Sequence, residues 1–134
     1  EIHHEFSGKV VTSSVDENYI GAEVGSNNTA ELTAFAEALR WCLKQGGEEE
    51  IVIKTDSQYA GNQATGKWKA KANRELVAHV QKLWKEVCEL RKLSWEHVKA
   101  HSGHRWNERA DHLAIRAATN DSPASLSFWK PGQR

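Results

Sequence analysis

The chain has 134 residues, of which 39% are hydrophobic and 27% are charged, and its formal net charge is zero with histidine neutral. This length indicates one domain with a core of its own, and the composition is that of an ordinary soluble globular protein. The charge balance argues against a strongly basic protein, so any contact with nucleic acid has to come from a local patch.

Nothing in the chain indicates a membrane protein. No apolar run approaches the roughly 18 residues of a spanning helix, and no signal peptide is visible, although the first residue is not Met. Cys42 and Cys88 fall in predicted helices and are expected to be free core thiols, with a disulfide as the alternative. Free thiols are typical of a reducing compartment, so we expect an intracellular protein of the cytoplasm or nucleus.

The chain opens with short extended segments. Residues 2–6 and 9–13 are predicted to form strands around a turn, and residues 19–25 a third extended piece. The next segment has helical periodicity, with Asn28 expected to cap its start and Gly46 to end it in the left-handed conformation. Its apolar stripe comprises Leu32, Phe35, Ala36, Leu39, Cys42 and Leu43.

Strands and helices alternate further along the chain. An apolar run, residues 51–53, indicates a short buried strand that ends at Asp56 and is followed by a short helix. Residues 73–90 are predicted to form a second long helix, and residues 92–100 another strand. Asn107 is expected to cap a third helix, which ends at residue 118. Its apolar stripe comprises Ala110, Leu113, Ala114 and Ala117.

This alternation predicts an α/β sheet domain, which we assign to residues 1–119. Residues 120–134 are polar, carry both prolines and are predicted to form a C-terminal tail.

Three carboxylates stand at positions typical of a site. Glu31 opens the first long helix, Asp56 follows the buried strand, and Asp111 lies early in the last helix. Each has a simpler interpretation. Glu31 could complete a capping box with Asn28, Asp56 could cap the short helix after it, and Asp111 could favour a helix N-terminus electrostatically.

Open α/β sheets place their sites at the carboxyl ends of strands, where two helix starts would bring these carboxylates together. Such a cluster repels itself unless cations neutralise it, and hard oxygen ligands suit Mg²⁺ or Mn²⁺. Two such ions, roughly 3.5–4 Å apart, stabilise the attacking and leaving oxygens of a phosphoryl displacement. His101 lies in a glycine-containing loop ten residues before Asp111 and could assist proton transfer or product release. His104 of the same loop is less favoured, and His97 is expected to be structural.

The segments "SNNTAEL", "TDSQYA" and "VKAHSGHRWNERADHLA" resemble signature segments of the type 1 ribonuclease H family, in the family's order and with similar separations. The matching region spans about residues 19–118. The resemblance implies a ribonuclease H-like fold, in which helices flank a mixed sheet of five strands. It also implies hydrolysis of the RNA strand of RNA–DNA hybrids with two Mg²⁺ ions, giving 5′-phosphate and 3′-hydroxyl ends.

On this resemblance, Glu31, Asp56 and Asp111 match three of the family's four metal-binding carboxylates, and His101 matches its loop histidine. The resemblance also implies contacts with the minor groove of the hybrid from Asn27, Asn28 and Gln58. Amide side chains suit this task because a 2′-hydroxyl both donates and accepts hydrogen bonds. The "NN" pair could also be only a turn followed by a cap.

The chain departs from the family in one respect. The family's first strand ends in an Asp-Gly-Ser type motif whose Asp binds both metals, and no such motif precedes Glu31. We expect residues 1–6 to match the family's second strand. An N-terminal segment, a second chain or a strand-exchanged copy would then supply the first. In the alternative, "EIHHEF" is the first strand and Glu5 the fourth carboxylate.

A local basic patch surrounds Trp68. Lys67, Lys69, Lys71 and Arg74 could hold a phosphate backbone while the indole stacks on a sugar or base. The alternative is a solvated helix start. Two functions follow from the whole sequence: an endoribonuclease acting on hybrids, or an inactive hybrid-binding or scaffold domain that lacks the fourth carboxylate.

Overall fold

The computed structural model describes residues 4–100 and 103–133. The chain divides into two compact units, each described by itself. The central unit comprises Val10–His97, and the terminal unit comprises Glu1–Lys9 with Val98–Arg134.

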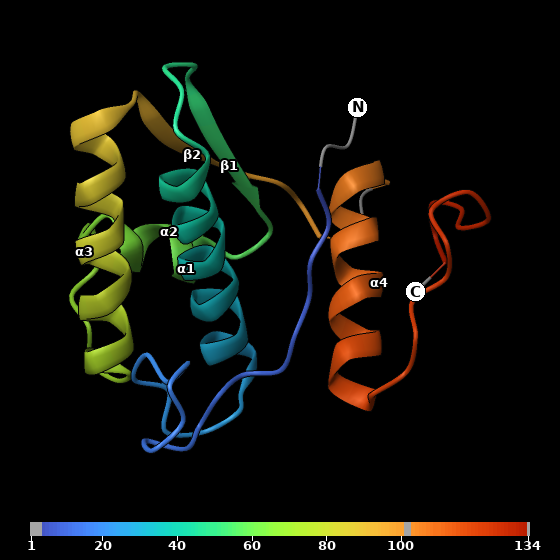
Figure 1. The fold of residues 1–134 in the computed structure, drawn as a ribbon, viewed down its shortest axis with the longest axis horizontal. Helices are drawn as coiled ribbons and strands as arrows, with labels where there is room; N and C mark the ends of the chain where they lie inside the picture. The colour runs from blue at the N-terminus through green and yellow to red at the C-terminus, as the bar shows by residue number, and fades with distance from the viewer. Residues whose placement is uncertain (1–3, 101–102, 134) are drawn as a thin grey trace. The chain divides into compact units, whose positions relative to one another are not determined.

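The central unit contains three helices and two strands in its described residues (Figure 1). In chain order they are α1 (Asn27–Gln45), β1 (Ile51–Thr55), α2 (Gln58–Ala64), α3 (Arg74–Leu90) and β2 (Leu93–His97). The two strands pair in parallel, with Ile51 opposite Leu93 and Thr55 opposite His97. The predicted α/β class is therefore confirmed, and both strands end at the same edge of the sheet.

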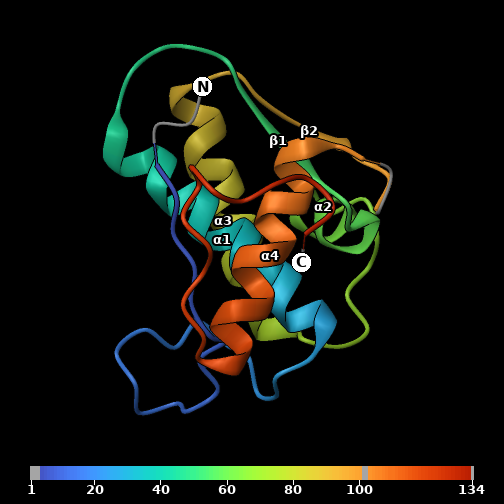
Figure 2. The same cartoon turned by 90° about the vertical axis from the view of Figure 1, so that its right-hand side faces the viewer.

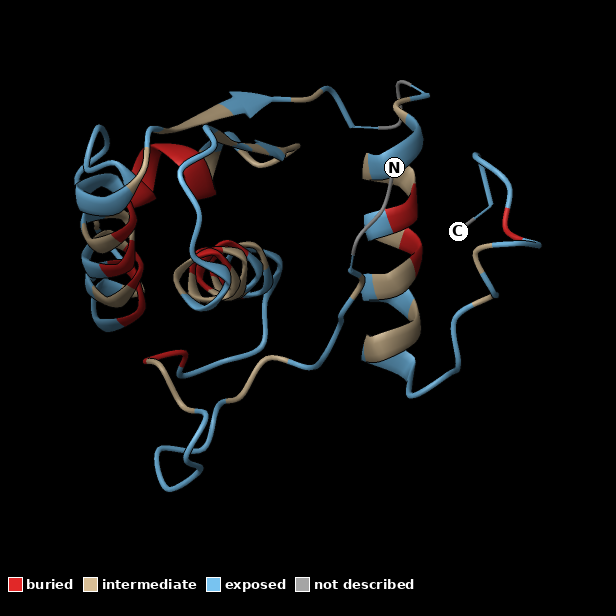
Figure 3. Cartoon of the chain, turned by 45° about the horizontal axis from the view of Figure 1, so that its top comes forward, coloured by how far each residue is buried: buried red, intermediate tan, exposed pale blue. Residues whose placement is uncertain are grey.

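The core of the central unit lies between α1 and α3, which run side by side (Figure 1). Both helices carry an apolar stripe at helical spacing, and Figure 3 shows the buried positions following one side of each helix. The rings of Phe35 and Trp84 meet between them at a centroid distance of 5.9 Å. The fully buried residues of this core include Leu32, Ala36, Leu39, Leu76 and Val80.

The helix α2 lies against the strands. Its Gly61 faces the ring of Trp95 in β2, and a Cβ placed on Gly61 would come within 2.4 Å of that ring. Glycine is therefore required here for close approach, because a side chain would displace either the helix or the tryptophan.

The three N-terminal strands predicted from the sequence are absent from the described residues. Residues 4–6, 9–13 and 19–25 form no strand, and residues 2 and 3 lie outside the described part. A strand depends on ladder hydrogen bonds to a neighbour, and the described sheet contains β1 and β2 alone. Residues 10–25 instead pack as a loop, in which Ala22 is fully buried in the core.

The strand β1 is buried on one side only. Ile51, Ile53 and Thr55 are half-buried, whereas Val52 and Lys54 are exposed. The prediction of a buried strand therefore holds for one side only, because a sheet of two strands leaves alternate side chains facing solvent.

The terminal unit contains one helix in its described residues, α4 (Arg105–Thr119). Its buried residues are Arg109 and His112. The prediction that α4 buries a stripe of alanines and Leu113 was therefore wrong. The cause is the C-terminal segment, residues 120–133, which runs alongside α4 in Figure 2. This segment has no helix or strand, yet its Trp129 is only 3% exposed.

The cysteines are both free, and only one belongs to the core. Cys42 is buried, and this burial raises the pKa of its thiol, so it stays neutral. Cys88 is exposed, which corrects the prediction of two core thiols. Among the helices described, none has the length and apolar character needed to cross a bilayer.

Candidate metal site and nucleic-acid interface

Glu31 is not part of a capping box. The box at the start of α1 is formed by Ser26 and Thr29: the Thr29 N–H donates to Ser26 Oγ at 3.1 Å, and the Ser26 N–H donates to Thr29 Oγ1 at 2.8 Å. Asn28 therefore lies within the helix and does not cap it. No acid stands in the first turn of α1, so the half-buried Glu31 has no capping role.

Asp56 lies in the link between β1 and α2 and does not cap α2. The cap is Ser57, whose Oγ accepts a hydrogen bond from the Ala60 N–H at 3.0 Å. The Ser57 N–H in turn donates to Thr55 Oγ1 at 3.1 Å. This arrangement leaves the half-buried Asp56 at the carboxyl end of a parallel strand, where α/β folds place their sites.

Asp111 lies almost two turns into its helix. The helix α4 begins at Arg105, two residues earlier than predicted, and its cap is His104, whose Nδ1 accepts from the Asn107 N–H at 3.2 Å. The acid of the first turn is Glu108. Because the helix dipole acts mainly within the first turn, Asp111 is too far along to be explained by it. All three simpler interpretations of the carboxylates are thus wrong.

These carboxylates are distributed over the two units. Glu31 and Asp56 belong to the central unit and Asp111 to the terminal unit, while His101 lies outside the described residues. Over residues 4–100 and 103–133, no three His, Cys, Asp or Glu side chains form a group that could hold a metal. The shared metal site therefore stays a prediction.

The other histidines of the region have different positions. His104 is the cap of α4, a structural role that the sequence did not reveal. His97 is the exposed last residue of β2.

Glu5 is paired with an arginine of α4. It accepts two hydrogen bonds from Arg109 of α4, from Nε at 2.7 Å and from Nη2 at 3.0 Å. The bond to Arg109 lowers the pKa of Glu5 against the opposing effect of burial. Because residues 4–6 form no strand and the carboxylate is held by a guanidinium, the alternative assignment of Glu5 to the metals has no support.

The amide side chains predicted to contact substrate stand at helix starts of the central unit. Asn27 and Asn28 are the first two residues of α1, and Gln58 is the first residue of α2. All three are exposed. Their positions leave the side chains accessible to a ligand, which is consistent with the predicted role.

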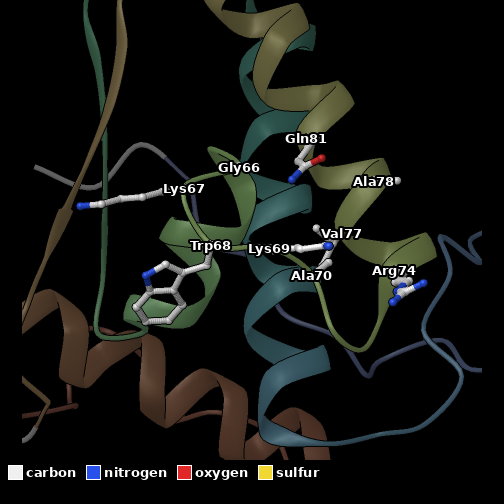
Figure 4. Close-up of a pocket in the computed structure, with 9 residues that line it drawn as sticks. All are labelled: Gly66, Lys67, Trp68, Lys69, Ala70, Arg74, Val77, Ala78 and Gln81. Carbon is white, nitrogen blue, oxygen red and sulfur yellow. The ribbon is translucent and has the colours of Figure 1, made fainter.

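The basic patch around Trp68 lines an open pocket of about 600 Å³ (Figure 4). Trp68 is 43% exposed, and Figure 4 shows the Lys67 side chain extending away from that of Lys69. Lys71 is exposed but does not line the pocket. The residues that do are Gly66, Lys67, Trp68, Lys69, Ala70, Arg74, Val77, Ala78 and Gln81.

Gln81 is a pocket residue that the sequence interpretation missed. It lies about two turns after Arg74 on the same side of α3. Its Nε2 donates to the carbonyl of Gln63 at 2.9 Å. This bond connects α3 to the end of α2 beside the pocket. Helical spacing could have identified Gln81, because positions 74, 77, 78 and 81 share one side of a helix.

Known proteins resemble this chain over most of its length. The sequence profile of RNase H matches residues 6–119. A protein named Ribonuclease H from Tropheryma whipplei (strain Twist) is 35% identical over 134 residues, covering 88% of this chain and 80% of that protein. A protein of the same name from Neisseria meningitidis serogroup C is 38% identical over 106 residues, covering 72% and 71%.

A solved structure agrees with this result. The crystal structure of RNase H1 from the halophilic archaeon Halobacterium salinarum NRC-1 matches with a TM-score of 0.57 and 30% identity, covering 72% of this chain and 70% of that one. The resemblance carried by the three sequence segments is therefore confirmed. The chain belongs to the type 1 ribonuclease H family.

Proposed function

We propose that the protein is an endoribonuclease that hydrolyses the RNA strand of RNA–DNA hybrids with the help of divalent metal ions. One observation carries the proposal beyond family membership: the half-buried Asp56 follows the carboxyl end of β1, which pairs in parallel with β2, and α/β folds place their sites at this edge of a sheet.

Glu31, Asp56 and Asp111 are the residues that would hold the metals, and their oxygen donors fit Mg²⁺ or Mn²⁺. When bound, two such ions supply an activated water and charge stabilisation at the attacking and leaving oxygens. The 3′ oxygen leaves, so the products carry 5′-phosphate and 3′-hydroxyl ends. His101 assists turnover.

Substrate contacts come from two exposed surfaces of the central unit in this proposal. Asn27, Asn28 and Gln58 read the 2′-hydroxyls of the minor groove. Lys67, Trp68 and Lys69 hold the phosphate backbone and stack on a sugar or base. The exposure of all six side chains supports their availability.

A second function is an inactive hybrid-binding or scaffold domain. The observation that favours it is the engagement of Glu5, the alternative fourth carboxylate, by Arg109.

Cleavage of an end-labelled RNA–DNA hybrid in Mg²⁺ decides between the two. The nuclease is expected to release products with 5′-phosphate ends, and Asp56→Asn to abolish the release. Asp121→Asn is the matched control, since this exposed carboxylate lies in the C-terminal segment. Hybrid binding without cleavage, in the wild type and in Asp56→Asn alike, would establish the second function instead.

A further inference from the structure

Arg109 joins three separate parts of the terminal unit. Its guanidinium donates from Nε and Nη2 to Glu5 in the N-terminal segment, and from Nη1 to the carbonyl of Ala124 in the C-terminal segment at 2.9 Å. Its Cζ also lies 5.5 Å from the ring centroid of Trp129. Arg109 is 4% exposed, and each of its three guanidinium nitrogens donates to one of two chain segments that are more than 100 residues apart.

Trp129 completes this arrangement. Its ring lies 6.3 Å from that of His112 and 6.0 Å from the guanidinium of Arg105, and its Nε1 donates to the carbonyl of Gln133. His112 is fully buried, and its Nε2 accepts from the Ala124 N–H at 2.9 Å. The C-terminal segment is therefore held on α4 by the packing of Trp129 and by the hydrogen bonds of the Ala124 backbone to His112 and Arg109.

These contacts all fall on one side of α4. Arg105, Arg109 and His112 lie within about 60° of one another around the helix, at about 100° per residue. Asp111 lies about 160° from Arg109 by the same measure, on the far side of the helix. Figure 3 shows the buried positions of α4 facing the C-terminal segment.

We propose that Arg109, Glu5 and Trp129 form a clamp that holds both terminal segments on the back of α4 and so fixes the position of Asp111 on its front. The clamp residues are positioning residues that act through Asp111, and the idea rests on the proposed function. Groups hydrogen-bonded directly to metal ligands change metal affinity by about 10- to 100-fold when they are removed. The clamp acts from the opposite side of α4, so we expect an effect at the low end of this range.

The test compares Trp129→Ala with Phe128→Ala. The second variant is a matched control, because Phe128 is the neighbouring aromatic residue in the same segment and is 82% exposed. Amide hydrogen exchange within α4 and calorimetric Mg²⁺ binding are measured alongside hybrid cleavage at a temperature well below melting. Trp129→Ala is expected to speed exchange along α4 and to raise the half-saturating Mg²⁺ concentration roughly tenfold. Phe128→Ala should leave the exchange rate along α4 and the half-saturating Mg²⁺ concentration unchanged. Trp129→Phe, which keeps an aromatic ring, should give values of both close to those of the wild type.

Arg109→Lys serves as the second variant if Trp129→Ala unfolds the terminal unit. Lysine keeps the charge but loses the forked hydrogen bonds to Glu5, so a smaller shift in the same direction is expected. Faster exchange with unchanged Mg²⁺ half-saturation would show a purely structural clamp and overturn the proposal, as would no change in either. If the wild type neither cleaves hybrid nor binds Mg²⁺, the proposed function fails, and the positioning role of the clamp fails with it. Hydrogen exchange then shows separately whether the clamp holds α4.

Discussion

Gly61 of α2 and Trp95 of β2 are in closer contact than any side chain at position 61 would allow. A Cβ at that position would lie 2.4 Å from the indole ring. The contact holds α2 against the sheet. Asp56 lies in the short link between β1 and α2, so the contact also constrains the position of Asp56.

Gly61→Ala is therefore expected to destabilise the protein by about 1–3 kcal/mol, the usual cost of overpacking. Urea unfolding followed by tryptophan fluorescence measures the change. Gly25→Ala is the control, because a Cβ there meets nothing within 4 Å. Equal midpoints for the two variants would show that α2 adapts freely to the strand.

The start of α1 gives a second prediction. Ser26→Ala removes the capping box with Thr29 and is expected to cost about 0.5–2 kcal/mol. Asn28→Ala should leave stability almost unchanged, because the structure places Asn28 inside the helix, where it caps nothing. The same urea experiment compares them, and a larger loss for Asn28→Ala would restore the cap predicted from the sequence.

The pocket around Trp68 predicts two distinguishable effects on hybrid binding. Trp68→Ala should weaken binding by about 1–3 kcal/mol, the value of one stacked base, with little change in salt dependence. Lys67→Ala should instead lower the slope of log affinity against log salt by roughly one phosphate contact. Fluorescence anisotropy of a labelled hybrid at several salt concentrations separates the two, with the exposed Lys85→Ala of α3 as the control. High affinity that ignores salt would contradict the assignment of this patch.

The pair of Glu5 and Arg109 predicts a loss of stability in acid. The hydrogen bond to Arg109 lowers the folded-state pKa of Glu5 below its ordinary value of 4.5. The pair therefore contributes fully above pH 4.5, and the contribution disappears as pH falls through the lowered pKa.

Glu5→Gln tests this expectation. It should cost roughly 1.5–3 kcal/mol at pH 7, the range for a hydrogen bond to a charged group, and progressively less below pH 4.5. Unfolding midpoints measured from pH 7 to pH 3 give the comparison. Parallel curves for wild type and variant over that whole range would show that the contribution of the pair to stability does not depend on pH.

Substitutions of Asp111 and of His101 should have different effects on cleavage and on its Mg²⁺ dependence. Asp111→Asn is expected to reduce cleavage strongly and to alter its Mg²⁺ dependence, because a ligand is lost. His101→Ala should slow turnover by about 10²-fold, a modest general acid–base effect, at an unchanged Mg²⁺ requirement. Cleavage rates over a Mg²⁺ titration decide this, and equal, negligible effects would remove both residues from the site.

Local pattern alone predicted much of the central unit. The apolar stripes of α1 and α3 recur every three or four residues, and the apolar run of β1 is followed by turn and cap residues. These features repeat within a few residues, so neighbouring side chains specify them. The three motif segments were likewise readable from the sequence, and with them the family.

Tertiary contacts decided the rest. The N-terminal segments alternate like strands, but a strand also needs a partner for its backbone. Which residue caps the start of α1 or α4 depends on where the chain enters the helix, and Ser26 and His104 were each close to an equally suitable asparagine. The buried face of α4 is polar in sequence, with Arg109 and His112, and it is buried because Trp129 and Glu5 come from distant parts of the chain to pair with it. A charge can be buried only where such partners meet it, and that meeting exists only in the folded chain.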